Sequence, residues 1–248
     1  MATWTVKFYP FNLLELATVD VNGDADYGFP ESRLYDRAIS LYWRDTVTEA
    51  KTITIDQGAS GDLQADFLAI EKHNFDGIAL DWQYSSDNFS ADTNDAVAGW
   101  TQNGNDRIVK TLSSPILSRY WRVAIASIAN PRASEVYISK GYEFNCLRES
   151  NPFGEHAANV QWNATVGGIE RSTKLGPKRR IRNYSFFLSA SEFADFETVI
   201  DYLSDYSLPF YFKDHSGAYF SARFYEMPVF DFNHATHTRV DIRIIEML

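Results

Sequence analysis

Several features are scarce in this sequence of 248 residues, and each scarcity excludes a class of protein. A single cysteine, Cys146, cannot form an intramolecular disulfide or a zinc site built from several cysteines. No run of about 18 apolar residues occurs, and the N-terminal segment lacks a signal-peptide pattern. Basic residues are outnumbered, 23 against 33 acidic ones, so a general nucleic-acid binder is disfavoured. We therefore expect no disulfide, no membrane insertion and no specific nucleic-acid partner.

Aromatic residues, in contrast, are abundant at 15% of the chain, with Trp 6, Tyr 14 and Phe 18. Aromatic and β-branched residues favour strands. Apolar and polar residues alternate with period two in residues 51–56, 78–84 and 120–126, as they do in half-buried strands. Helical periodicity is weak in this first part of the chain. These patterns predict an antiparallel β-sandwich.

Composition and turn-forming residues divide the chain near its middle. Residues 149–155 carry turn formers without periodicity. Residues 1–150 have a net charge of −8 and residues 151–248 one of −2. We therefore predict a first domain over residues 1–145, a linker over residues 146–157 and a second domain over residues 158–248.

The second part mixes strands with one helix. Ser189 and Glu192 form an S-x-x-E capping box, in which the two side chains bind free backbone N–H groups at a helix start. An apolar stripe at three- and four-residue steps follows, formed by Phe193, Phe196, Ile200 and Leu203. Alternating strands are predicted on either side of this helix, the last with Val240, Ile242 and Ile244 on one face. The predicted fold class is mainly β, a sandwich followed by an α+β domain with an antiparallel sheet and one helix.

The order of several short segments in residues 20–144 resembles the discoidin, or galactose-binding-like, family. The segments include Tyr42-Trp43, the strand that ends at His73-Asn74, and the Ser85-Ser86-Asp87 turn after an aromatic strand. The resemblance implies a jelly-roll β-sandwich in which His73 has a structural role. A sandwich of this kind also implies glycan binding as one function.

Residues 158–248 are similar in element order to the tail-tube-like domain of bacteriophage minor and distal tail proteins. The similarity includes Gly167-Gly168, the basic stretch that ends at Arg182, the helix after Ser189 and the strand over residues 238–244. It implies a ring subunit whose neighbours pair edge to edge.

Together, the two resemblances predict a structural virion protein of a phage tail tip or baseplate. Such a protein acts by assembly and catalyses nothing. Its partners are other phage tail proteins and further copies of itself in a homo-oligomeric ring, and it resides in the virion after assembly in the host cytoplasm. The alternative is a carbohydrate-binding module that recognises a surface glycan. A glycan-degrading enzyme is a third hypothesis, although no pair of carboxylates stands out.

An acidic loop is the sharpest local motif. Its candidate metal ligands are the oxygen-bearing side chains at alternate positions, Asp20, Asn22, Asp24 and Asp26. Calcium prefers such oxygen ligands, so the loop predicts a structural calcium site as the one cofactor. The competing interpretation is a solvated Asn-Gly turn without metal.

Two further sets of residues are candidate contact sites. Trp100 lies in a stretch rich in glycine and asparagine, so we predict that it contacts a ligand from a loop. The charged residues Arg239, Asp241 and Arg243 alternate on the outer face of the last strand, which we predict to be an edge strand that pairs with a neighbouring subunit. Arg179 and Arg180, in the basic stretch, are predicted either to meet acidic neighbours at a subunit interface or to form a solvated charged face.

Overall fold

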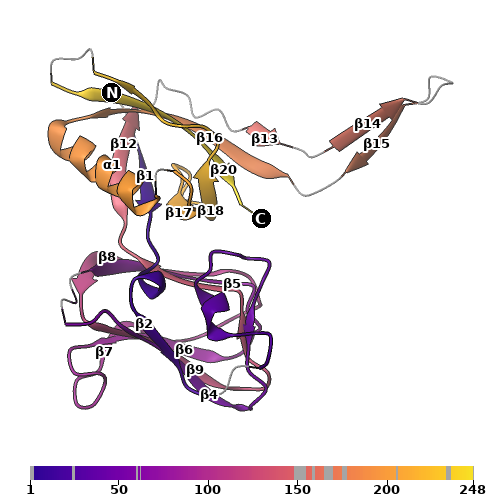
Figure 1. Ribbon diagram of the computed structural model, residues 1–248, viewed down its shortest axis with the longest axis vertical. Coiled ribbons are helices and arrows are strands. Elements are labelled where there is room, and N and C mark those ends of the chain that lie inside the picture. The colour runs from indigo at the N-terminus through magenta and orange to yellow at the C-terminus, as the bar shows by residue number, and fades with distance from the viewer. Residues whose placement is uncertain are drawn as a thin grey trace. The chain divides into compact units, whose positions relative to one another are not determined.

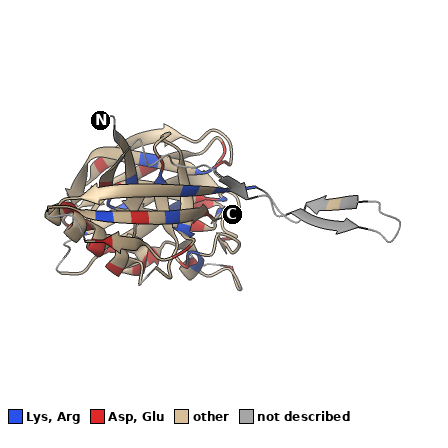
Figure 2. Cartoon of the chain, turned by 90° about the horizontal axis from the view of Figure 1, so that it is seen from above, with Lys and Arg blue, Asp and Glu red and all other residues tan. Residues whose placement is uncertain are grey.

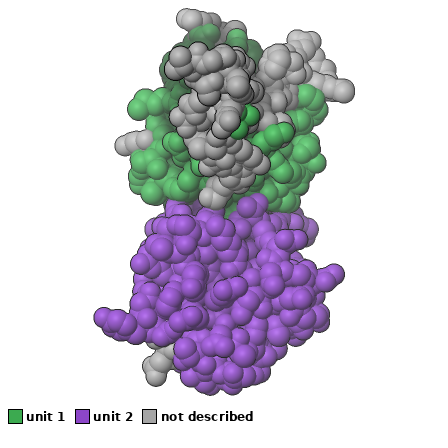
Figure 3. All heavy atoms as spheres, turned by 90° about the vertical axis from the view of Figure 1, so that its right-hand side faces the viewer, with its two compact units in different colours: residues 1–10, 142–248 green, residues 11–141 purple. Residues whose placement is uncertain are grey.

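The structure is a computed structural model, and it describes residues 3–23, 26–59, 61, 63–147, 155–157, 160–164, 170–174, 178–204, 206–232 and 236–247. The chain forms two compact units, coloured separately in Figure 3. Unit 1 comprises residues 1–10 and 142–248, and unit 2 comprises residues 11–141. Unit 2 is therefore an insertion between two strands of unit 1, β1 (Thr3–Tyr9) and β12 (Tyr142–Leu147).

This division differs from the predicted domains, which assigned residues 1–145 to the sandwich. The first strand pairs antiparallel with β12, with Phe8 opposite Tyr142 and Trp4 opposite Cys146. Because these two strands are far apart in the sequence, no local pattern predicts that they pair. The predicted linker over residues 146–157 starts inside β12 and ends at β13 (Glu155–Ala157), while residues 148–154 lie outside the described part of the chain.

Unit 2 is a β-sandwich of antiparallel strands (Figure 1). Its larger sheet has the order β2 (Thr18–Val21), β4 (Glu49–Asp56), β9 (Tyr120–Ile128), β6 (Ala79–Ser85) and β7 (Asn94–Thr101). A three-stranded sheet has the order β11 (Glu135–Ser139), β5 (Gln64–Glu71) and β8 (Ile108–Leu117). The short elements are β3 (Trp43–Arg44), paired with β10 (Arg132–Ala133), and the 3-10 helices η1 (Leu13–Glu15) and η2 (Glu31–Leu34).

The alternation read from the sequence explains which side chains form the core of unit 2. Trp121, Val123 and Ile125 of β9 are buried, as predicted, and they lie beside buried Ile53 and Ile55 of β4. Strand β5 has no such alternation because every residue after Gln64 is buried, including the successive residues Phe67 and Leu68, which point to opposite faces. A strand covered on both faces reads as a continuous apolar run.

Unit 1 is built on one large antiparallel sheet and one α-helix among its described residues. The order of the sheet is β13, β16 (Arg179–Leu188), β12, β1, β17 (Phe210–Lys213), β18 (Tyr219–Phe224), β20 (Thr238–Glu246) and β19 (Val229–Asp231). A separate hairpin pairs β14 (Val160–Ala164) with β15 (Glu170–Lys174). The helix α1 (Ala190–Tyr202) begins at the predicted capping box: Glu192 N–H donates to Ser189 Oγ, and Ser189 N–H donates to Glu192 Oε2 at 2.8 Å.

The last strand is not an edge strand, which corrects the prediction made for it. On one side β20 pairs with β16 along its length, from Thr238 opposite Leu188 to Ile245 opposite Ile181. On its other side it pairs with β18 and β19. The pairing of β20 with β16 joins two strands from distant places in the sheet order and closes the sheet on itself. Because partners within the chain already satisfy its backbone, β20 does not need a neighbouring subunit.

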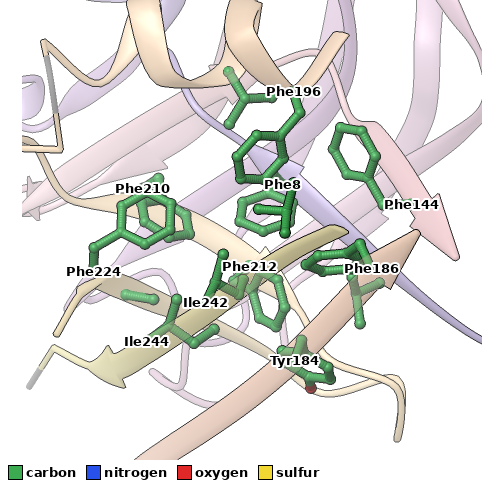
Figure 4. Close-up of a cluster of buried hydrophobic side chains, with 14 of the residues drawn as sticks. Phe8, Phe144, Tyr184, Phe186, Phe196, Phe210, Phe212, Phe224, Ile242 and Ile244 are labelled. Atoms are coloured by element: carbon green, nitrogen blue, oxygen red, sulfur yellow. The ribbon is translucent and has the colours of Figure 1, made fainter. Parts of the chain in front are cut away.

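Phenylalanine rings fill the core of unit 1 (Figure 4). Phe8 lies at the centre, with ring centroids 5.0 Å from Phe212 and 5.7 Å from Phe144 in edge-to-face geometry. The predicted apolar stripe of the helix faces this cluster, since Phe196, Ile200 and Leu203 are buried. The predicted fold class, mainly β with a β-sandwich and an antiparallel sheet that carries one helix, is confirmed. Among the described residues, no helix combines the length and apolarity that crossing a membrane requires.

Candidate functional site

A pocket of about 220 Å³ opens among the loops of unit 2. Its lining combines an aromatic ring, aliphatic side chains and hydrogen-bond donors, contributed by Ile39, Ser40, Leu41, Tyr42, Lys72, Arg132 and Ser134. These residues come from three places: the segment between η2 and β3, the residue after β5, and the start of β10 with the residue that follows it. Binding residues commonly lie on loops that a rigid scaffold positions, and this pocket has that arrangement.

Hydrogen bonds from the Asn74 side chain and from the backbone hold these segments together. The side chain of Asn74 donates from Nδ2 to the carbonyl of Asn130 at 3.0 Å and accepts from the N–H of Arg132 at 3.0 Å. Ser134 donates its N–H to the carbonyl of Glu71 at 3.0 Å. The loop after β5 is therefore fixed to the segment that carries Arg132.

A buried carboxyl group fixes the third segment. Glu135 accepts from Asn12 Nδ2 at 2.9 Å and from the backbone N–H of Arg37 at 3.1 Å. Burial raises the pKa of Glu135 well above its usual range, and the nearby charge of Glu15 adds to this effect. Arg37 in turn pairs with Glu15 through its guanidinium. The residues that precede Ile39 are thus tied to the strand next to Ser134.

An aromatic stack supports Tyr42. Its ring lies on that of Phe29, with centroids 4.8 Å apart and planes 23° from parallel. The guanidinium of Arg44 lies 4.3 Å from the centre of the same Phe29 ring and forms an ion pair with Asp26. The neighbouring Trp43 is fully buried and anchors the segment. Tyr42 itself is half-buried, so part of its ring remains available to a ligand.

Among the residues that the structure describes, neither cation of the pocket has a counterion. Glu71, the nearest carboxylate along the chain, forms an ion pair with Arg107. Within the described part of the chain, neither the Lys72 nor the Arg132 side chain has a hydrogen-bond or ion-pair partner, and both are exposed. Lys72 also adopts a φ of 44°, a left-handed conformation that is uncommon for a residue with a side chain. Two unpaired cations in one pocket of a chain with net charge −10 indicate an anionic ligand.

His73 has the structural role that the sequence implied. Its side chain is 2% exposed; Nδ1 accepts from the N–H of Phe75 at 3.1 Å, and Nε2 lies 2.6 Å from the carbonyl of Asp106. Burial lowers the pKa of His73, so the neutral ring is favoured. This ring orders the loop beside Lys72 and does not face the pocket as a ligand.

The predicted calcium ligands have different partners in the structure. Asp20 is exposed on β2, and Asn22 Nδ2 donates to the carbonyl of Ala50 at 3.0 Å. Asp26 pairs with Arg44, and Asp24 lies outside the described residues. The described residues contain no group of three or more metal-ligating side chains of His, Cys, Asp or Glu. The calcium site stays a prediction.

The positive charge beside the acidic loop is the ammonium group of Lys51. Lys51 Nζ is fully buried and lies 2.6 Å from a carboxylate oxygen of Asp45 and 2.6 Å from one of Glu49. Burial alone lowers the pKa of Lys51, but the hydrogen bonds to Asp45 and Glu49 outweigh it and raise the pKa. Gly23 leaves room for the ammonium, since a Cβ there would lie 2.3 Å from Nζ.

Trp100 lies in a strand rather than in the predicted loop. It is part of β7, where it pairs with Leu80 of β6, and it is partly buried. The Lys110 ammonium lies 4.3 Å from the centre of its ring. The prediction of a loop was wrong because glycine in a strand weakens it but does not prevent its pairing with an antiparallel neighbour. Ligand binding by Trp100 stays a prediction.

The predicted interface residues form contacts within unit 1. Arg239 pairs with Asp241 at 3.1 Å, and the alternation of positive and negative charge along β20 is visible in Figure 2. The guanidinium of Arg243 lies 4.6 Å from the centre of the Tyr225 ring. Arg180 approaches Glu246 at 3.7 Å, while Arg179 is exposed at the start of β16. Their role in an interface stays a prediction, but the free edge on which it was based is absent.

Comparison of the sequence with protein-family models and with curated proteins gives no match. Solved structures resemble part of the chain. CpGH89CBM32-6 from Clostridium perfringens has a TM-score of 0.43 and 21% identity over 52% of this chain and 99% of its own. A family 32 carbohydrate-binding module from C. perfringens NanJ, solved with galactose, has a TM-score of 0.40 and 15% identity over 54% of this chain and 98% of its own.

A chitosan-binding module from a Paenibacillus chitosanase/glucanase has a TM-score of 0.41 and 17% identity over 51% of this chain and 97% of its own. These similarities concern the fold. They overturn the prediction of a structural virion protein, since the similar structures are carbohydrate-binding modules and none of these matches supports a phage tail.

The sequence alone does not identify the residues of the pocket as a site. Tyr42 and Lys72 stand inside the segments that carried the discoidin-like resemblance, but only as parts of its pattern. Arg132 carried no signal. One clue to the pocket is present in the sequence, since Lys72 directly precedes His73-Asn74. In the structure, the side chains of these two residues bind distant backbone groups. Such a sequence indicates a constrained loop, but its neighbours in space follow only from the tertiary structure.

Proposed function

We propose that this protein is a non-catalytic carbohydrate-binding protein that recognises a surface glycan through the loop pocket of unit 2. The observation that carries the proposal is the combination of Tyr42 with the unpaired side chains of Lys72 and Arg132 in one pocket. An aromatic ring packs against the apolar face of a sugar, and charged donors fix its polar groups. At about 220 Å³, the pocket is smaller than those that enclose drug-sized ligands, and it suits a single sugar ring.

The charge of the pocket specifies the sugar further. Arg132 is suited to bidentate contact with a carboxylate or sulfate, and Lys72 supplies a second positive charge. The preferred ligand is therefore a glycan with an acidic sugar. Pre-formed loops reduce the entropic cost of binding, because Asn74 and Glu135 already hold the lining segments in place.

The test of this function compares the binding of two matched sugar series, oligogalacturonides and galactose oligomers. The two series share the ring stereochemistry, but the galactose oligomers lack the carboxylate. Calorimetric titration of the full chain is expected to show binding of the acidic series and binding of the neutral series that is weaker by about tenfold or more. Binding of the acidic series should weaken with added salt. Preference for neutral sugars would contradict the proposal that the ligand is acidic. If the chain binds neither series, and also none of a wider array of acidic and neutral glycans, the proposed function is wrong.

Substitutions locate the binding in the pocket. The double variant Lys72→Gln/Arg132→Gln is expected to lose most affinity for the acidic oligomers, and Tyr42→Ala to lose affinity for both series. Lys178→Gln, an exposed cation in unit 1, removes one charge of the same sign elsewhere and should bind as the unmodified chain does. Equal weakening in this control would show that general charge, rather than the pocket, determines binding.

A further inference from the structure

A second pocket, in unit 1, has the opposite charge. It has a volume of about 480 Å³ and lies between helix α1 and strand β19. Its lining combines four aromatic side chains with two carboxylates: Phe193, Tyr206, Phe230, Phe232, Glu197 and Asp201. It has no part in the glycan binding proposed for unit 2.

Three of the rings that line this pocket come from the helix and from the strand side, and they pack against one another. Phe193 of the helix is close to perpendicular to both phenylalanines on the strand side, with centroids 5.9 Å from Phe230 and 5.8 Å from Phe232. Those two rings are nearly parallel, at 16°. Phe232 is 67% exposed, a large apolar surface in contact with water. Exposed aromatic surface that lines a pocket is typical of a binding site.

The two carboxylates are placed where the helix itself disfavours them. Glu197 and Asp201 are four residues apart, so they lie on the same face one turn apart and repel each other. Asp201 stands in the last turn, where the helix dipole is negative and where no basic residue occurs. Neither side chain has a hydrogen-bond or ion-pair partner among the described residues. A cation in the pocket would relieve this repulsion.

The turn after the helix contributes a fourth ring, that of Tyr206, to the lining of the pocket. Tyr206 has a φ of 74°, which is unfavourable for a residue with a side chain. The conformation is held because the N–H groups of Ser207 and Leu208 both donate to the carbonyl of Leu203, at 3.0 and 3.2 Å. The chain thus adopts a strained turn at the position that contributes to the pocket.

We propose that this pocket binds an organic ammonium ion, with the trimethylammonium group of choline as the representative ligand. The face of an aromatic ring carries negative electrostatic potential and attracts a cation, and the methyl groups of a quaternary ammonium pack on apolar walls. Glu197 and Asp201 supply the opposite charge. A small inorganic cation would satisfy the carboxylates, but it is strongly hydrated and has no methyl groups to pack on the four rings, so the combination favours an organic cation.

The test compares choline with its uncharged isostere 3,3-dimethyl-1-butanol, which has the same shape without the positive charge. Titration of the full chain, followed by calorimetry or by the NMR signals of the aromatic rings, is expected to show choline binding that is about tenfold or more tighter than that of the alcohol. Equal binding of the two would overturn the charge-based assignment. No binding of choline at millimolar concentration would overturn the proposal altogether.

Two variants and their controls assign the binding to this pocket. Phe232→Ala is expected to weaken choline binding, whereas Met227→Ala, at a residue that is 73% exposed and outside this pocket, should leave it unchanged. Glu197→Gln/Asp201→Asn should abolish binding while the melting temperature of the free protein stays equal or rises, because the repulsion is gone. Glu226→Gln is the matched control for loss of an exposed carboxylate. Unchanged choline binding in the double variant would overturn the proposal.

Discussion

The two units stabilise their interiors in different ways. Among the described residues, ten buried polar or charged side chains lie in unit 2 and two, Asp214 and Ser221, lie in unit 1. Unit 1 instead concentrates phenylalanine rings around Phe8. Buried polar groups have fixed partners and directions, whereas apolar contacts are less directional. The comparison shows that unit 2 uses its buried polar groups to hold the loops that line its pocket, while unit 1 relies on ring packing to hold its closed sheet.

The largest expected effect is removal of the central ring of unit 1. Phe8→Ala deletes a fully buried side chain that contacts several other rings and should lower the free energy of unfolding by about 4 kcal/mol. Urea denaturation measures this change. Phe232→Ala removes the same ring from an exposed position and should cost less than about 0.5 kcal/mol. Similar losses in both variants would contradict the assignment of the core to Phe8.

The corresponding change in unit 2 removes a buried cation. Lys51→Met leaves the buried carboxylate of Asp45 without its partner and should lower the free energy of unfolding by about 3 kcal/mol. Adding Asp45→Asn to this variant removes the unpaired charge and should restore part of the loss. Because the pKa of Lys51 is raised in the folded state, the stability from this shift is present below about pH 10 and is lost as pH rises through the folded pKa. No recovery in the double variant would argue against a paired charge.

A smaller effect concerns the histidine that orders the pocket loop. His73→Gln should lower the free energy of unfolding at pH 7 by about 1 kcal/mol, because it disturbs two buried hydrogen bonds. The folded state lowers the pKa of His73, so its contribution is present above about pH 6.5 and is lost as pH falls through the folded pKa. Thermal melting between pH 7 and pH 5 should therefore be less pH-dependent in this variant. An unchanged slope of melting temperature against pH in His73→Gln would contradict this role.

The smallest effect is expected at the Ser-Ser-Asp turn of unit 2. Burial acts to raise the pKa of Asp87, but hydrogen bonds from Ser85, Ser90 and the following backbone outweigh it and lower the pKa to about 2. The resulting stability is present above about pH 4, the range of an unfolded aspartate, and decreases as pH falls toward 2. Asp87→Asn should reduce the melting temperature slightly at pH 7 and flatten its dependence on pH between 4 and 2. An unchanged acid profile would contradict this role.

Local patterns in the sequence predicted much of the secondary structure. The alternation at Trp121, Val123 and Ile125 fixed the buried face of β9, and the Ser189–Glu192 capping box marked the start of the helix. Each of these signals depends on residues within a few positions of one another, where periodicity and capping act. The structural role of His73 also followed from the family pattern in which it stands.

Contacts between distant segments decided the rest. The pairing of β1 with β12 made the sandwich an insertion, and the pairing of β20 with β16 removed the predicted free edge. The pocket also depends on contacts between segments that are far apart in the sequence. Tyr42, Lys72 and Arg132 come from three such segments. Hydrogen bonds of Asn74, Ser134 and Glu135 hold these segments together. Local sequence determines which residues can form a strand or a cap, since those energies arise between neighbours. Which strand lies beside which, and which unpaired charges share a pocket, depends on burial and hydrogen bonding summed over the whole chain, and only the tertiary structure decided them.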